Sequence, residues 1–505
     1  MKNLIEVSKI VTRKKVRKIE IFDDHTLKNK ESKFNIFYEK LMDGKLRNDR
    51  DAATILYDCS PTDDRYRQLK SRFRKRLLNT LFFLDVNLAD NSSYDRAYYT
   101  ANKDWALVKI LLANESPHTA ASLARQILQT SLRYKFADLI INCSRILRQY
   151  CMENENEKEF ELYDNHLKQY TDILNAEIRS EEMFQRVMLN YYKPTAENDN
   201  LEERIDVYCD GLISLSEVYD SPVIWYNMFL VWTYRYEMLQ DYEGMVEVCD
   251  RAEKYMRDNP NYYQEEKQTT FHLKKMSAFL HLKDYKRGKL NAEKSLASFE
   301  EGSESWFSFM EYYLLLAMHT ENYINALAIL SKAFLQARFK KLSNDAKERW
   351  KMYEVYLNYI VQIYGEENTI LRRQSRPAFR TTKFMSTTPL YSKDMRIFSI
   401  FTLIAQVLFR LEEKHFIEAG DAIERLKNYA NRQLKREENY RLIQFIRLLQ
   451  QLSKANFKQE ELSLTDKYLK RLEEQPFFYR GLTHELEVLP YEKLWDIMLK
   501  RLKDA

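Results

Sequence analysis

Glycine and proline are scarce in this chain, whose 505 residues contain 8 Gly and 9 Pro. Average usage would supply about 60 of the two together. Turn-rich β-sandwiches, barrels and propellers need those residues for their turns, so the composition excludes these folds. The closest two glycines, Gly288 and Gly302, are 14 residues apart. The chain therefore contains no GxGxxG or GxxxxGK[ST] loop of the kind that cradles phosphate groups.

Long apolar runs and cysteine motifs are missing as well. The longest stretches without a charged residue, Ser221–Tyr234 and Ile397–Phe409, have 14 and 13 residues, whereas a membrane-spanning helix needs roughly 18–20. Residues 1–20 carry seven Lys and Arg and no apolar run of a secretory leader. The five cysteines are scattered and form no CxxC pair, which is typical of reduced thiols. We expect a cytoplasmic protein without a membrane partner.

Signatures of catalysis and metal binding are equally sparse. None of the eight histidines lies in an HExxH motif, and His272 and His281 have no ligand pattern around them. No GxSxG motif exists, and no cysteine lies in a protease signature. We therefore expect a protein that is not an enzyme and that holds no metal or cofactor. An enzyme with an unfamiliar helical site stays open, because missing motifs are weak evidence.

The charge of the chain is unevenly distributed. Residues 1–85 hold 21 Lys and Arg against 13 Asp and Glu, and residues 369–396 hold seven basic residues against Asp394 alone. Since the net charge of the whole chain is only +5, the remainder is mildly acidic. Two basic segments on an acidic body favour surfaces for partners.

Nearly all of the chain after residue 30 shows helical periodicity. In Thr62–Asp85, apolar residues recur every three or four positions, which predicts one amphipathic helix. Glu31–Leu41 and Asp51–Tyr57 predict two shorter helices before it, and Tyr491–Leu502 predicts one near the end. Val16–Phe22 alternates briefly and predicts a lone strand.

A short phrase recurs along the chain: a polar residue, then Tyr or Phe, then two residues, then usually a small one. Its copies begin at Asp241, Asp284, Asn322 and His415, and a looser copy begins at Lys135. The first three aromatic residues, Tyr242, Tyr285 and Tyr323, are 43 and 38 residues apart. Apolar helical runs precede and follow each copy, so each phrase marks the turn of a helix hairpin.

These features resemble the tetratricopeptide repeat, most strongly over residues 205–345. The resemblance implies that an aromatic residue near the end of the first helix packs beside a small residue that opens the second, as Tyr285 with Gly288. The chain departs from the family in its longer periods and in Met245, which stands where a small residue belongs. Leu77–Phe83 and Val488–Trp495 are similar to segments of an uncharacterised family of bacterial helical-repeat proteins, which implies a helical fold and no activity.

We therefore expect an all-α fold, with antiparallel helix pairs in a superhelical, tetratricopeptide-like solenoid and a basic N-terminal helical module. The predicted parts are the basic module (1–90), helical repeats (91–365), a basic loop or arm with Pro and Thr (366–395), and C-terminal helical repeats with a cap (396–505). Each helix pair buries its faces on its neighbours in such an array.

The loop 366–395 is the first candidate partner site. Its basic residues are Arg372, Arg373, Arg376, Arg380 and Lys383. Guanidinium forks suit carboxylates and phosphates, and Phe379 and Phe384 would supply apolar anchors. A connection of this length inside a compact body is often functional. The alternatives are a flexible insertion, or a segment that lies over neighbouring acidic helices.

The helix predicted over Thr62–Asp85 is the second candidate. Arg67, Lys70 and Arg74 lie on it, after a short helix and a turn, as in a helix-turn-helix module that contacts nucleic-acid phosphates. Side chains that read bases are few, with Gln68 and Asn79. A solvated basic face and a surface for an acidic protein are the alternatives.

The expected function is a non-enzymatic cytoplasmic scaffold or adaptor, which binds a protein or peptide partner through a helical-repeat surface. The alternative is a nucleic-acid-associated regulator, which contacts phosphates or another polyanion through residues 45–85.

Overall fold

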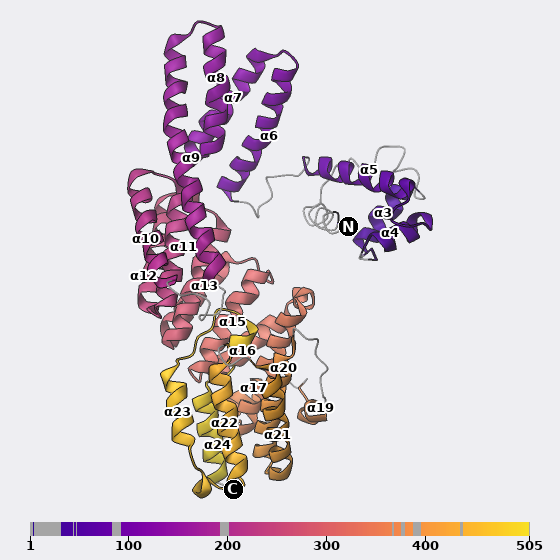
Figure 1. Cartoon of the computed structure of the whole chain (residues 1–505), viewed down its shortest axis with the longest axis vertical. Helices are drawn as coiled ribbons and strands as arrows, with labels where there is room; N and C mark the ends of the chain where they lie inside the picture. Colours follow the sequence, from indigo (N-terminus) through magenta and orange to yellow (C-terminus); the bar gives the residue numbers. More distant parts are fainter. Residues whose placement is uncertain are drawn as a thin grey trace. The chain divides into compact units, whose positions relative to one another are not determined.

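A computed structural model describes residues 4, 32–43, 45–46, 48–82, 92–191, 201–365, 368–374, 379–386, 395–434 and 438–503. These residues form 22 α-helices, α3 to α24, with short 3₁₀ turns and no β-strand among them (Figure 1). The predicted all-α class is confirmed. The strand predicted at Val16–Phe22 lies outside the described residues.

The chain divides into two compact units, Met1–Thr171 and Asp172–Ala505, and the boundary lies within α9. The helices that begin in unit 1 are α3 (Lys33–Met42), α4 (Asp49–Tyr57), α5 (Asp64–Leu81), α6 (Ser93–Ala113), α7 (Pro117–Tyr134), α8 (Ala137–Glu153) and α9 (Glu157–Tyr191). The three helices predicted before residue 90 are therefore present, with ends within a few residues of the predicted ones.

Unit 2 continues with helices that pack mainly on their neighbours in sequence. They are α10 (Leu201–Val218), α11 (Pro222–Met238), α12 (Tyr242–Asp258), α13 (Glu265–Leu282), α14 (Tyr285–Ser295), α15 (Glu304–His319), α16 (Tyr323–Leu335), α17 (Asn344–Tyr364), α18 (Thr369–Gln374), α19 (Thr381–Ser386), α20 (Ile397–Glu412), α21 (Phe416–Gln433), α22 (Tyr440–Lys454), α23 (Thr465–Glu474) and α24 (Tyr491–Lys503). The short helices α18 and α19 lie inside the predicted loop 366–395.

Seven connections between successive helices share one backbone conformation. One residue adopts left-handed angles, with φ between 52° and 62°, and the next N–H donates to the carbonyl five residues back. The left-handed residues are Glu115, Lys135, Glu155, Gln240, Lys283, Glu321 and Lys414. This is the Schellman helix ending, which is usually made with Gly. Because only two or three residues separate the helices, each pair runs antiparallel.

Four copies of the recurring phrase begin directly after the left-handed residue, and the looser copy begins at the left-handed Lys135 itself. Asp241 and Asp284 cap the next helix, where their carboxylates accept from the N–H groups of Gly244 and Arg287, both at 2.9 Å. In the four copies that begin at Asp241, Asp284, Asn322 and His415, the aromatic residue is the first residue of the second helix, as Tyr285 is of α14, whereas Phe136 of the looser copy is the N-cap of α8. The placement of this ring near the end of the first helix was wrong, because Asp and Asn are helix-capping residues and the helix starts after them.

The rings of the phrase join neighbouring hairpins. Four of them stack on a ring in or just after the following helix, at interplanar angles between 10° and 26°. The stacked pairs are Tyr242–His281, Tyr285–Tyr313, Tyr323–Tyr364 and Phe416–Phe457. These rings thus contribute to the packing between successive pairs.

The small residue of the phrase permits close helix approach, as predicted. A Cβ atom at Gly288 of α14 would lie 2.2 Å from Leu316 Cδ2 of α15 and 3.4 Å from Phe279 Cβ of α13. Ala326 of α16 is fully buried at the equivalent position. Only a side chain of this size fits between the helices there.

Unit 2 has one large hydrophobic core that extends from α12 to α24. Its largest side chains include Trp306, Trp350 and Trp495, each less than 2% exposed. Unit 1 has two smaller cores, one among α3, α4 and α5 and one among α6 to α9. Across the described residues, none of the helices is both long and apolar enough to cross a bilayer.

Candidate functional site: a helical face that holds an extended segment

The main candidate site lies in unit 2, where residues 475–490 pass over α13, α15 and α17 without forming an α-helix (Figure 1). This segment, the strap, joins α23 to α24 and contains a single 3₁₀ turn, Thr483–Glu485. Tyr479, Leu486 and Leu489 of the strap are at most 2% exposed. Tyr479 and residues 486–490 of the strap are therefore part of the protein interior, whereas 475–476 are exposed and most of the others are half-buried.

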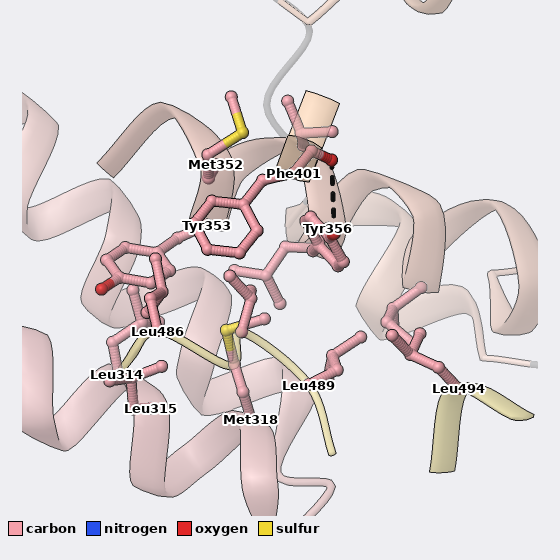
Figure 2. Close-up of a cluster of buried hydrophobic side chains, with 14 of the residues drawn as sticks. Leu314, Leu315, Met318, Met352, Tyr353, Tyr356, Phe401, Leu486, Leu489 and Leu494 are labelled. Atoms are coloured by element: carbon pink, nitrogen blue, oxygen red, sulfur yellow. Dashed lines mark hydrogen bonds between the residues drawn. The ribbon is translucent and has the colours of Figure 1, made fainter. Parts of the chain in front are cut away.

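Apolar side chains anchor the second half of the strap. Leu486 and Leu489 belong to the same buried cluster as Leu315 and Met318 of α15 and Met352 of α17 (Figure 2). Full burial of a leucine side chain is worth about 1.5–3 kcal/mol. These two residues alone make this end of the strap part of the core.

Two histidines bind the backbone of the strap. His281 of α13 donates from Nδ1 to the carbonyl of Ser277 at 2.7 Å and accepts from the N–H of Tyr479 at Nε2, at 3.1 Å. Both ring nitrogens are used by the neutral form, and burial lowers the pKa of His281 to about 4. His319 of α15 donates from Nε2 to the carbonyl of Glu487 at 2.7 Å, and burial lowers its pKa to about 3. These bonds recognise extended backbone, whatever the side chains.

An aromatic ring closes this end of the site. Phe477 of the strap stacks on His281 at 5.5 Å and lies 4.5 Å from His319, measured between ring centroids. Tyr242, the first residue of α12, also stacks on His281, at 4.3 Å. The strap therefore extends the series of ring stacks that joins the hairpins.

A buried carboxylate accepts a hydrogen bond from the tyrosine of the strap. Glu311 of α15 is 5% exposed, and its Oε1 accepts from the hydroxyl of Tyr479 at 2.5 Å and from Tyr353 of α17 at 2.8 Å. Arg349 of α17 donates to both carboxylate oxygens, at 2.8 and 3.3 Å. Because the guanidinium compensates the charge, Glu311 stays a strong acceptor for a phenol inside the core. Burial raises the pKa of Tyr479 well above its usual value.

Polar contacts continue along the strap. The hydroxyl of Thr483 donates to Asp345 of α17 at 2.9 Å and accepts from Arg349 at 3.1 Å. Arg480 pairs with Glu485 within the strap at 2.5 Å and donates to the carbonyl of Tyr191 in α9 at 2.7 Å. The polar groups of the strap thus have partners on several helices.

Arg441 of α22 holds both ends of the strap. Its guanidinium pairs with Glu487 at 2.8 Å and with Glu492 of α24 at 2.7 Å. It also donates to the carbonyls of Leu472 and Gln475, at 2.6 and 2.7 Å, where α23 ends. One side chain therefore closes the loop that the strap makes over the helices.

The strap was not found by sequence reasoning, and its partners on the helices were not either. One signal was present for Glu311, which is the lone charged residue in the apolar run Trp306–Met318. A carboxylate in such a run must be paired when the helix is buried. Its partners, Arg349 and Tyr479, lie 38 and 168 residues further along the chain, so no local pattern connects them.

The structure describes only some of the side chains of the predicted partner arm. Arg380 and Lys383 are exposed. The side chains of Arg372, Arg373 and Arg376 lie outside the described residues. The two proposed anchors, Phe379 and Phe384, pack on buried Phe409 of α20 at 6.3 and 6.0 Å. In this structure these rings contact the chain itself, as in the alternative of a segment that lies over neighbouring helices.

The basic residues predicted on the N-terminal helix separate into two kinds. Arg67 and Arg74 are exposed on α5. Lys70, in contrast, forms an ion pair with Asp49 of α4 at 2.6 Å, and Tyr66 donates to the same carboxylate oxygen. The structure does not bring the three together as one open surface, because Lys70 joins α5 to α4.

Comparisons with models of protein families, with curated proteins and with solved structures found no match for this chain. Over the residues that the structure describes, no group of three or more His, Cys, Asp or Glu side chains is placed to hold a metal ion.

Proposed function

We propose that this chain is a non-enzymatic scaffold or adaptor that binds an extended segment of a protein partner on the helices that carry the strap. The observation that supports this function is the strap itself. Histidines, a buried carboxylate and stacked rings hold it through its backbone and side chains. Helical-repeat proteins bind partners on extended surfaces, and main-chain hydrogen bonds combined with side-chain pockets can hold an extended peptide.

The proposed architecture is a tetratricopeptide-like superhelical array of antiparallel helix pairs. Three features of the described helices support it: the shared turn of seven connections, the ring stacks between successive pairs, and the close approach at Gly288. Each unit of a helical repeat contacts its neighbours through equivalent positions, as these features do.

The proposed location is the cytoplasm. All five cysteines are unpaired, and four of them are buried. Burial raises the pKa of the Cys143 and Cys209 thiols to about 12, which keeps them protonated and unreactive. Unpaired thiols that serve as small core residues suit a reducing compartment.

The strap defines the chemistry of the partner. A segment that replaces it needs an aromatic residue at the position of Phe477, a tyrosine hydroxyl for Glu311 and an extended backbone for His281 and His319. Such a segment competes with the strap for the same atoms.

A labelled peptide that spans residues 475–489 tests the function. The strap is weakened in the full chain by Phe477→Ala with Arg480→Ala, which leaves the Tyr479–Glu311 bond in place. We expect the peptide to bind this variant at least about tenfold more tightly than the wild type in fluorescence anisotropy, because the internal competitor is weaker. A matched peptide with Phe at the position of Tyr479 should bind less tightly, since Glu311 then loses a donor.

Failure of the peptide to bind a variant with native circular dichroism would contradict the proposal. Equal affinity for the two peptides would show that Glu311 does not select the partner.

A further inference from the structure

The three helices at the start of the described chain form a module with its own core. Phe37 of α3 stacks on Phe73 of α5 at 4.5 Å, and Ala52, Ala53 and Leu56 of α4 pack against them. One side of α5 is committed to this core. A short helix, a turn and a longer basic helix are the topology of helix-turn-helix modules.

The basic residues of α5 that border the core interact with other side chains of the module. Lys70 pairs with Asp49 at 2.6 Å, and Arg65 pairs with Asp63 at 2.9 Å. The guanidinium of Arg76 lies 4.9 Å from the centre of the Phe34 ring. These three cations stabilise the module and are not directed to a ligand.

The opposite side of α5 is an open cationic face. The residues that form this outward face, all exposed, are Arg67, Gln68, Ser71, Arg72, Arg74 and Lys75. Arg72, Arg74 and Lys75 have no ion-pair or hydrogen-bond partner within the described part of the chain, and Arg67 has only a 3.6 Å contact with exposed Asp64. Four positive charges therefore lie on one side of two helical turns.

The chemistry of this face distinguishes nucleic acid from an acidic protein. Protein interfaces have an apolar, often aromatic centre, whereas the outward residues from Arg67 to Lys75 are all polar, and the first exposed apolar residue on this side of α5 is Leu78, at its C-terminal end. Between its cations lie Gln68 and Ser71, which can donate to and accept from base edges or phosphates.

We propose that the outward face of α5 binds duplex DNA, with α5 in the major groove. This goes beyond the scaffold function, which concerns unit 2. A helix of 18 residues is about 27 Å long, and the major groove of B-DNA is wide enough to admit it, whereas that of A-form RNA is not. Arginine forks match guanine edges and phosphate oxygens, and glutamine matches adenine.

Binding of the full chain to a labelled DNA duplex of about three helical turns tests this inference. Anisotropy is measured between about 50 and 200 mM salt, where four phosphate contacts give a log–log slope of about −3 to −4. Arg72→Ala with Arg74→Ala should weaken binding and reduce the magnitude of the slope by about 2. The control Lys45→Glu, at an exposed residue paired with Asp43, should leave the slope unchanged.

Three results would overturn the inference. Absent or salt-independent binding would show that the face does not contact phosphates. Equal affinity for an RNA duplex of the same sequence would rule out the major groove. Equal affinity for a polyglutamate peptide would show a general surface for acidic chains. All variants change exposed side chains, so unchanged helical circular dichroism is required before binding is compared.

Discussion

At the scale of single residues, Gly288 and Gly420 are two helical glycines that differ in the space around them. A Cβ atom at Gly288 would lie 2.2 Å from Leu316 Cδ2, whereas at Gly420 of α21 the nearest atom is Ser453 Oγ at 3.7 Å. We expect Gly288→Ala to lower the free energy of unfolding by about 1–3 kcal/mol, because the fully buried Leu316 side chain must leave its position. Gly420→Ala should raise it by about 0.4–1 kcal/mol, because alanine is the better helix residue and fits. Denaturant titration measures both, and a stabilising Gly288→Ala would contradict the packing described.

His319 makes the stability of the folded chain depend on pH. Burial lowers its pKa from 6.5 to about 3, and the charges of Lys283 and Arg441 and the His281 ring act in the same direction. The unfolded chain binds this proton below pH 6.5 and the folded chain does not until about pH 3, so stability falls on acidification. Between pH 7 and pH 5 the loss from this group is about 2 kcal/mol.

The variant His319→Gln isolates this loss, because glutamine keeps a donor for the Glu487 carbonyl and does not titrate. We expect the unfolding free energy of the wild type to fall by about 2 kcal/mol more than that of the variant between pH 7 and pH 5. Parallel curves of free energy against pH would show that His319 does not stay neutral in the fold.

Residue patterns predicted part of the basic surface. Arg67 and Arg74 are exposed on α5 as expected. Lys70 shares their spacing along the helix, but it lies nearer the stripe of Tyr66 and Leu69, where Asp49 of α4 reaches it. The position of a carboxylate on another helix cannot be read from spacing, so the sequence did not reveal that Lys70 is paired with Asp49.

At the scale of the element, several helices end in a left-handed turn that is made by a residue other than glycine. Lys414 adopts φ 62° before α21, which costs a non-glycine residue about 1–2 kcal/mol. We expect Lys414→Gly to raise the free energy of unfolding by about 1 kcal/mol. The control Lys427→Gly, at an exposed position inside α21, should lower it by about 1 kcal/mol. Thermal denaturation of both variants decides, and a shift of the same sign in both would be inconsistent with the left-handed turn.

Helical elements were predictable because their apolar residues recur at the period of the helix. The strap was not predictable, because the apolar residues of an extended segment on a helical surface do not recur at a regular spacing. Residues that interrupt helices were nevertheless present: Pro476 and Pro490 lie near its two ends, and Gly481 adopts φ 88° within it. Proline ends the helix before it, which indicates a break but not the surface on which the segment lies.

At the scale of the whole molecule, the cores differ in size and therefore in protection. Trp306, Trp350 and Phe398 of α15, α17 and α20 belong to the large core of unit 2. The core of α3, α4 and α5 has few buried residues. We expect amide hydrogen exchange, followed by mass spectrometry, to be slowest in α15 and α17 and faster by at least about tenfold in α5. Equal protection of α5 and α15 would contradict separate cores.

The strap lies more than a hundred residues after α17 in the chain, although it covers that helix. A ribosome that adds about 5–20 residues per second completes α13, α15 and α17 on the order of ten seconds before Tyr479 exists. Until the strap is made, the Glu311 carboxylate lacks the Tyr479 hydroxyl, His281 and His319 lack their backbone partners, and Leu315 and Met318 lack the leucines of the strap. Nascent chains of this protein thus pass through a period in which the surface beneath the strap is exposed and chaperones can bind it. A chain that is truncated before residue 475 keeps this surface exposed permanently.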